Sequence, residues 1–339
     1  MPETTDDEKL KSCEQTDCPV RASGKCLEGL EPESCSHFYW SDGEESEGEQ
    51  DKKPDQNNLI RLFPGTELHT KELGIVTYEH PTNLIIIIGE SFSGKSTVLT
   101  SIFDMFQVGK FKQFYFAGSY TQYGFESRCH LSRAPSGLVE PDTAHTQSIE
   151  FNFLHIAFKD KENLSRDAHH LLLSDISGER FNMAINSATM MTEMSLMKEA
   201  EHLVYLLDGE KLADKFQRNA IVTRANQFIS RAVDNGLFDT DTEITIIFTK
   251  YDLLTDIVND GTLEKIKKSF VDRFEANLSA IKFEVIAARP KPPTADIPFG
   301  FGLEHLLSVW LNKRKLPELN VGTIPSSERY FELYSYHNG

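Results

Sequence analysis

Apolar residues gather in short runs that are separated by longer stretches of mixed character. The runs lie at residues 83–89, 148–158, 169–176, 202–208, 243–249 and 281–288. Uninterrupted apolar runs of this length are typical of strands that a parallel sheet buries on both faces. The pattern therefore predicts an α/β fold built on a mostly parallel central sheet.

The stretches between the runs predict helices at 95–107, 180–200, 211–235, 261–276 and 302–312. The second and third runs are joined only by the polar segment "KDKENLSRDA". So short a link fits an antiparallel hairpin better than a helical crossover, so we expect one antiparallel edge strand.

The chain divides into four parts by composition. Residues 1–40 hold a cysteine cluster, 41–57 have no apolar residue and read as an acidic flexible linker, 58–315 carry the α/β pattern, and 316–339 form an aromatic-rich tail. The net charge is −17, and residues 1–56 contribute −10 of it (16 acidic against 6 basic residues). An acidic balance argues against non-specific nucleic-acid binding.

No apolar run is long enough for a membrane span and the N-terminus has no signal-like apolar region, so we expect a soluble, cytoplasmic protein.

A phosphate-binding loop follows the first apolar run. "GESFSGKS", from Gly89 to Ser96, satisfies G-x-x-x-x-G-K-[ST], with a strand predicted before it and a helix after it. Glycines let the backbone turn its N–H groups toward a phosphate, and the helix N-terminus favours an anion. Lys95 is expected to reach the β- and γ-phosphates, and the Ser96 hydroxyl to bind Mg²⁺.

Two further motifs follow at strand ends. "DISG" places Asp175 where it would hold Mg²⁺ through water and Gly178 where its N–H would contact a γ-phosphate. "TKYD" ends with Asp252, whose carboxylate accepts two hydrogen bonds from the N1–H and 2-amino group of guanine. Adenine would leave that carboxylate unpaired, a difference worth roughly 10⁴-fold in selection. The stem of Lys250 is expected to cover the base. "AAR", with Ala287 and Ala288, is a loose match to a loop that closes over guanine.

Residues 83–313 resemble a Ras-like, translation-factor-related (TRAFAC-class) P-loop GTPase domain, on the motifs GESFSGKS, DISG, TKYD and AAR. The resemblance implies the three-layer fold of that class, with GTP or GDP and Mg²⁺ as ligands. The implied nucleotide-binding residues are Gly89, Ser93, Gly94, Lys95, Ser96, Thr97, Asp175, Gly178, Thr249, Lys250, Asp252, Ala287 and Ala288.

The switch I and catalytic positions depart from that family's pattern. The threonine that would complete the Mg²⁺ site is Thr143 or Thr146, and we prefer Thr146 because it lies nearer the next strand. Glu179 stands where many relatives have a water-orienting glutamine, so we expect slow GTP hydrolysis, with Lys95, Glu179 and Thr146 as the catalytic set. Charge neutralisers would come from an activating partner, a homodimer, or arginines of this chain that we otherwise expect at the surface: Arg128, Arg133 and Arg180.

An insertion at 110–147 separates the first helix from the second strand and is dense in aromatic residues. Two interpretations stay open: a switch or partner surface, and aromatics that pack a local extension. Cys129, within it, is expected to be a buried apolar residue.

The other cysteines, Cys13, Cys18, Cys26 and Cys35, lie close together in the sequence. Their thiolates suit a structural Zn²⁺ ion, with His37 as a substitute ligand; an iron–sulfur cluster, free thiols and disulfides are the alternatives. The phrases "CPVRASGKCLEG" and "FAGSYTQYGFESRCH" loosely resemble stand-alone bacterial GTPases of predicted anti-phage conflict systems.

The sequence thus supports a Mg²⁺-dependent GTP-binding switch that acts through a protein effector. A non-hydrolysing, nucleotide-stabilised adaptor is the alternative, and an ATP-using kinase or motor is disfavoured by TKYD.

Overall fold

The computed structural model describes residues 10–15, 18–26, 29–41, 64–133, 136–137 and 151–312. The chain forms two compact units, Met1–Leu62 and Phe63–Gly339. The linker from residue 42 on, the tail beyond residue 312 and both switch I candidates, Thr143 and Thr146, lie outside the described residues.

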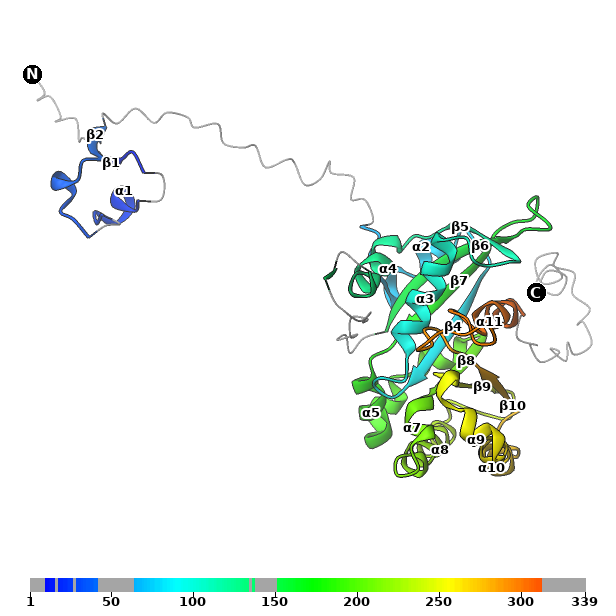
Figure 1. The fold of residues 1–339 in the computed structure, drawn as a ribbon. Coiled ribbons are helices and arrows are strands. Elements are labelled where there is room, and N and C mark those ends of the chain that lie inside the picture. The colour runs from blue at the N-terminus through cyan, green and yellow to red at the C-terminus, as the bar shows by residue number, and fades with distance from the viewer. Residues whose placement is uncertain are drawn as a thin grey trace, which may run out of the picture. The chain divides into compact units, whose positions relative to one another are not determined.

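An eight-stranded sheet forms the centre of the larger unit (Figure 1). Its order is β10-β9-β8-β4-β7-β6-β3, and β5 also pairs with β6. The strands are β3 (Leu68–His69), β4 (Thr82–Gly89), β5 (Phe114–Gly118), β6 (Asn152–Asp160), β7 (His169–Asp175), β8 (His202–Leu207), β9 (Glu243–Phe248) and β10 (Ala280–Val285). The five strands from β10 to β7 are parallel, and β6 is antiparallel to β7. The mostly parallel sheet and the hairpin are confirmed; the sheet continues past β6 because β3 and β5 pair with it, both antiparallel.

Helices cover both faces of the sheet, so the unit has three layers (Figure 1). Strand β4 illustrates why both faces are covered. Its apolar side chains alternate between the two faces, so each face needs helices to bury it. Ile85 and Ile87 pack against α3 (Lys95–Gln107), α4 (Gln122–Cys129) and α11 (Leu303–Trp310). Ile86 and Ile88 belong to the opposite core. Its helices are α2 (Gly74–Thr77), α5 (Gly178–Asn186), α6 (Ala188–Thr192), α7 (Gly209–Ala213), α8 (Arg218–Asp234), α9 (Thr255–Asn259) and α10 (Thr262–Phe274).

Two predicted helices are interrupted, which corrects the prediction of continuous helices at 180–200 and 211–235. Ser187 has extended backbone angles, and its hydroxyl accepts the N–H of Met190 to begin α6. Between α7 and α8, the Asp214 carboxylate accepts the N–H of Phe216 at 2.8 Å. In both places a short polar side chain competes for backbone donors and stops the helix.

The smaller unit has two strands, β1 (Leu10–Cys13) and β2 (Phe38–Ser41), paired antiparallel, and a short helix, α1 (Val20–Ser23). Its buried residues within the described part are Ser12, Val20 and Pro32. None of the helices in the described ranges of either unit is long and apolar enough to cross a bilayer.

Candidate functional site

The phosphate-binding loop connects β4 to α3 at the carboxyl end of the parallel strands. Gly89 ends β4 at a φ of 152°, and a Cβ there would lie 2.8 Å from both the carbonyl oxygen of Leu206 and the hydroxyl of Ser93. Only glycine therefore fits at the start of the loop. Lys95 opens α3 and is buried.

The Lys95 side chain folds back over the loop that precedes it. Its Nζ donates to the carbonyl oxygens of Gly89 at 2.8 Å and Glu90 at 2.7 Å. Burial lowers the pKa of Lys95 to about 8, although the carboxylates of Asp175 and Glu90 act in the opposite direction. The ammonium group therefore lies against the start of the loop, while Lys95 itself begins α3.

Two loop side chains were not assigned a detailed role by the sequence. The Glu90 carboxylate is buried and forms ion pairs with Lys211 at 2.8 Å and Arg224 at 2.5 Å, which fixes the loop to α7 and α8. The Ser93 hydroxyl is fully buried and has no hydrogen-bond partner among the described residues. A buried hydroxyl without a partner is costly unless a ligand supplies one, and a phosphate oxygen would do so.

The DISG segment follows β7 and packs directly on the phosphate-binding loop. A Cβ on Gly178 would come within 2.3 Å of the backbone nitrogen and the hydroxyl of Ser91. The Ser177 hydroxyl accepts the N–H of Arg180 and begins α5. Asp175, at the end of β7, is completely buried. The structure thus brings the first two predicted motifs into contact.

The TKYD segment follows β9 and is tied to the same loop. The Thr249 hydroxyl donates to the carbonyl of Ser93 at 2.9 Å. Lys250 adopts a left-handed backbone with φ of 50°, and its Nζ pairs with the carboxylates of Asp208 at 2.9 Å and Glu210 at 2.7 Å. Those partners come from the end of β8 and the start of α7, so neighbouring strands hold the lysine stem in place.

A cavity of about 760 Å³ opens between these segments. Its lining includes Gly94, Thr97, Thr249, Lys250, Asp252 and Ala288. All of them follow the carboxyl ends of parallel strands, where open α/β sheets bind ligands, and the volume suits a ligand of nucleotide size.

The loop after β10 forms one wall of the cavity. Asp252 accepts the backbone N–H of Lys291 at 3.1 Å, which joins the TKYD segment to this loop. Of the two alanines, Ala288 lines the cavity, whereas the N–H of Ala287 donates to the carbonyl of Phe301 at 3.1 Å.

The candidate catalytic and charge-neutralising residues are placed differently from the sequence expectation. Glu179 is exposed in the first turn of α5. The surface interpretation is wrong for Arg180, which is buried with its guanidinium 4.8 Å from the centre of the Phe151 ring. It is also wrong for Arg128, which is buried and donates to Asp175. Arg133 is partly exposed and pairs with Glu126 and Asp104.

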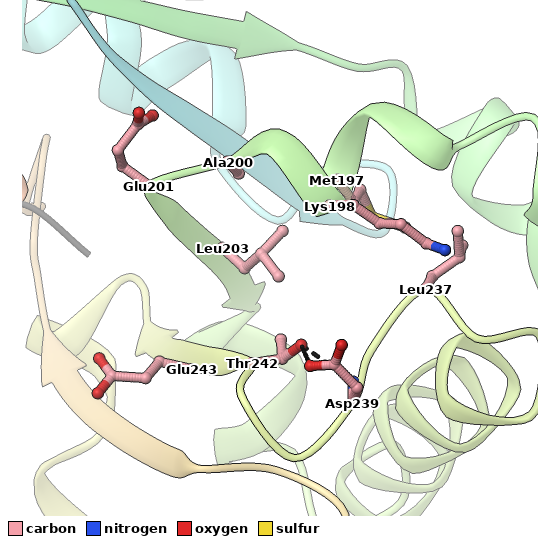
Figure 2. Close-up of a pocket in the computed structure, with 9 residues that line it drawn as sticks. All are labelled: Met197, Lys198, Ala200, Glu201, Leu203, Leu237, Asp239, Thr242 and Glu243. Carbon is pink, nitrogen blue, oxygen red and sulfur yellow. Dashed lines mark hydrogen bonds between the residues drawn. The ribbon is translucent and has the colours of Figure 1, made fainter. Parts of the chain in front are cut away.

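A second hollow lies at the other end of the sheet (Figure 2). It measures about 60 Å³, too small for a nucleotide, and is bordered by the amino ends of β8 and β9. Figure 2 shows the Thr242 hydroxyl donating to Asp239 beside it, at 2.8 Å. None of the predicted site residues lines it.

The described part of the insertion packs into the core and also presents aromatic residues outward. Phe114 and Phe125 are buried, whereas Tyr115 and Tyr123 are exposed. Cys129 is completely buried, and burial raises the pKa of its thiol to about 12. This confirms that Cys129 is an apolar packing residue and excludes a thiolate nucleophile at that position.

The smaller unit gives no support to the predicted zinc site. Within the described ranges, no three His, Cys, Asp or Glu residues are arranged to hold a metal ion. Cys13 does lie near two other thiols. A hydrogen bond with the Gln15 backbone lowers its pKa, but desolvation, a hydrogen bond with Cys18 and the charges of Cys18 and Cys35 together raise it.

Sequence reasoning missed the roles of Glu90, Asp208 and Glu210, and it missed the pairing of Arg128 with Asp175. Asp208 ends the predicted strand 202–208 at the same sheet edge, so its position was a usable signal. The pairing of Arg128 had no such signal in the sequence, because its partner Asp175 lies far along the chain.

Comparisons with known proteins agree with this geometry. The model of the Double-GTPase 2 family matches residues 83–311. Among curated proteins, none matches the chain. Three solved structures match the chain at 14% identity. Roco2 RocCORdC of Methanosarcina barkeri bound to GDP has a TM-score of 0.34 and is matched over 68% of this chain and 49% of its own. The Ski7 GTPase-like domain of S. cerevisiae, bound to GDP and inorganic phosphate, has a TM-score of 0.39 and coverages of 78% and 52%. The SRb-GTP/SRX complex of Chaetomium thermophilum has a TM-score of 0.31 and is matched over 61% of this chain and 91% of its own.

The chain spans about half the length of the first two of these structures. The family match is different, because it covers both the phosphate-binding loop and the TKYD segment and more than half of the sequence. The chain therefore belongs to the Double-GTPase 2 family of P-loop GTPases, and is a GTP-binding protein.

Proposed function

We propose that the protein is a Mg²⁺-dependent GTP switch with slow intrinsic hydrolysis. The observation that carries the proposal is the hydrogen bond from Thr249 to Ser93, which holds the base-reading and phosphate-binding segments at one cavity. Because the two segments are joined, a phosphate bound at the loop after β4 would affect the position of the base-reading segment after β9.

The cavity and the phosphate-binding loop beside it fit the parts of a guanine nucleotide. Lys95, the unpartnered hydroxyl of Ser93 and the N-terminus of α3 would take the phosphates. Asp252 would accept the two donors on the guanine edge, with the Lys250 stem against the base and Ala288 beside it. Gly94 and Thr97 line the cavity, and Gly89 allows the tight start of the loop.

Mg²⁺ would be held by Ser96 at the start of α3 and through Asp175, with Thr146 as the proposed switch I ligand. The ion would neutralise charge on the β- and γ-phosphates. Gly178, already in contact with the phosphate-binding loop, would offer its N–H to the γ-phosphate. Loss of the γ-phosphate would then release both switch segments.

The position of Glu179 supports slow hydrolysis. It is an exposed carboxylate, and its negative charge is poorly suited to orient water beside a γ-phosphate. It also favours the second candidate, an adaptor that binds GTP without hydrolysing it.

Single-turnover hydrolysis of radiolabelled GTP separates these two candidates. For the switch, we expect slow phosphate release that rises severalfold in Glu179→Gln, with Glu193→Gln, an exposed surface change, as control. No release from either protein would favour the adaptor. A failure of GTP to bind would reject both.

The remaining elements of the proposal concern partners and the small unit. We assign the effector to a bacterial signalling or defence system on the loose resemblance of the cysteine-rich segment. Zinc at Cys13, Cys18, Cys26 and Cys35 rests on composition and on the small number of buried residues there. Elemental analysis of the purified protein tests this assignment. One zinc per chain would support the zinc site, and iron would indicate an iron–sulfur cluster. The absence of both metals would reject both assignments.

A further inference from the structure

Helix α4 brings a buried arginine to the carboxylate that is proposed to serve Mg²⁺. The helix approaches the segment before β4 closely at Gly124, whose N–H donates to the carbonyl of Gly65 at 2.9 Å. A Cβ on Gly124 would lie 3.0 Å from the backbone nitrogen of Glu67. On its other side, the Phe125 ring stacks on Phe103 of α3, with centroids 4.6 Å apart. These contacts fix the first turn of α4, and Arg128 lies one turn further along the same helix.

Arg128 makes its shortest contact with Asp175. Its Nε donates to Oδ2 of Asp175 at 2.7 Å, and Nη1 donates to Glu67 at 3.3 Å and to the carbonyl of Gly124 at 3.0 Å. Asp175 is completely buried, and the Arg128 side chain is only 10% exposed. A buried ion pair of this geometry is strongly coupled, because removing either charge leaves the other unpaired in a poorly solvated place.

The pair bears directly on metal binding. A carboxylate that is neutralised by a guanidinium attracts a divalent cation less, and a Mg²⁺-bound water and Arg128 Nε would compete for the same oxygens. Arg128 has two other acceptors, Glu67 and Gly124, so it keeps partners when it leaves Asp175.

We propose that Arg128 is an internal competitor of Mg²⁺ at Asp175. In this account, binding of Mg²⁺ with nucleotide breaks the Arg128–Asp175 pair and loosens α4, so the insertion senses the metal-bound state. The inference rests on the proposed function, since it requires a guanine nucleotide and Mg²⁺ at this site. Arg128 is a positioning residue here, because it acts on the metal through Asp175.

The test is a Mg²⁺ titration of the binding of fluorescent GDP, starting from EDTA-treated protein. In Arg128→Met, the Mg²⁺ concentration that gives half of the gain in GDP affinity is expected to fall on the order of tenfold relative to wild type. Arg133→Met is the matched control, because Arg133 lies in the next turn and pairs with Glu126 and Asp104 instead. Its midpoint is expected to equal that of wild type. An equal or higher midpoint in Arg128→Met would overturn the proposal.

A second measurement uses the wild-type protein alone, since Arg128→Met leaves two carboxylates without their cation and is at risk of misfolding. Hydrogen exchange of residues 119–133 is measured with GDP in EDTA and with GDP and Mg²⁺. Faster exchange in α4 on adding Mg²⁺ is expected, and unchanged or slower exchange overturns the inference. If wild-type protein binds GDP, but Arg128→Met does not lower the Mg²⁺ midpoint and Mg²⁺ does not speed exchange in α4, the nucleotide assignment survives and only the role of Arg128 fails. If GDP does not bind, both fail.

Discussion

The hydroxyl of Thr249 donates a hydrogen bond of 2.9 Å to the backbone carbonyl of Ser93. Thr249 begins the base-reading segment after β9, and Ser93 belongs to the phosphate-binding loop after β4. The same hydroxyl lies 3.2 Å from the carbonyl of Leu207, at the end of the intervening strand β8. One buried side chain therefore fixes the spacing between the places proposed for the guanine ring and the phosphates.

Thr249→Val should weaken this link while keeping the side-chain shape. The change removes the hydroxyl donor of the Ser93 carbonyl, whereas the Leu207 carbonyl keeps the backbone N–H of Thr249. Loss of the Ser93 bond should cost about 1–3 kcal/mol in the free energy of unfolding. We expect a lower urea midpoint without nucleotide and weaker binding of both GTP and GDP. Thr240→Val, at an exposed position, is the control. A Thr249→Val protein with unchanged nucleotide affinity would show that the bond does not hold the two segments in register.

Gly178→Ala should disrupt the contact between DISG and the phosphate-binding loop. The added Cβ meets backbone atoms of Ser91 at 2.3 Å and 2.6 Å, and this backbone cannot easily move aside because the loop is held between β4 and α3. We expect a loss of GTP affinity of at least about tenfold, measured by calorimetry, with some loss of stability.

The matched control is Gly74→Ala. There the added Cβ meets the ring of Tyr78 at 2.7 Å, but that side chain is 92% exposed and is able to rotate away. GTP affinity in Gly74→Ala should match wild type. Equal affinities for all three proteins would mean that the loop tolerates movement at Ser91, contrary to the proposed geometry.

A buried histidine pair predicts acid sensitivity. His155 is 1% exposed; its Nδ1 accepts the N–H of Tyr120 at 3.0 Å, and its Nε2 lies 3.0 Å from Nδ1 of His170. Burial, followed by the neighbouring histidines, lowers the pKa of His155 to about 3 and that of His170 to about 4. Both rings are therefore neutral in the folded protein at pH 5, whereas the unfolded chain is protonated there.

Because the folded pKa values are lowered, the stabilisation is complete above pH about 6.5 and is lost as the pH falls toward 4. For His155 the loss is about 1.4 kcal/mol per pH unit within that window. Urea unfolding at pH 7.5, 6.0 and 5.0 checks it. His155→Gln should flatten the slope, and His305→Gln, at a largely exposed site, should keep it. Equal slopes in all three proteins would show that His155 does not titrate between the folded and unfolded states.

The strands and the main motifs could be predicted from the sequence because each depends on adjacent residues. Gly89, Lys95 and Ser96 lie in one loop, and Asp175 and Asp252 each end or follow an apolar run, so a local pattern was enough to place them at one sheet edge. The breaks at Ser187 and Asp214 were missed because apolar spacing continues across them. Side-chain competition for backbone donors is not visible in that spacing.

Contacts between distant segments could not be predicted in the same way. The pairing of Arg128 with Asp175 depends on the path of an insertion that has no motif, and on the close approach allowed by Gly124. Ala287 was expected among the nucleotide-binding residues, but its N–H donates to the carbonyl of Phe301, which follows a loop whose course the sequence does not specify.

The central claim is that Asp252 reads guanine in the cavity that opens beside the phosphate-binding loop. The most direct test compares the binding of GTP, XTP and ATP, each with Mg²⁺, to wild-type protein and to Asp252→Asn. Xanthine replaces the 2-amino group with a carbonyl, so an amide at position 252 pairs with it better than a carboxylate does. The account predicts that wild type prefers GTP over both other nucleotides by orders of magnitude and that Asp252→Asn binds XTP more tightly than GTP. Equal binding of ATP and GTP by wild type, or a variant that still prefers GTP over XTP, would contradict it.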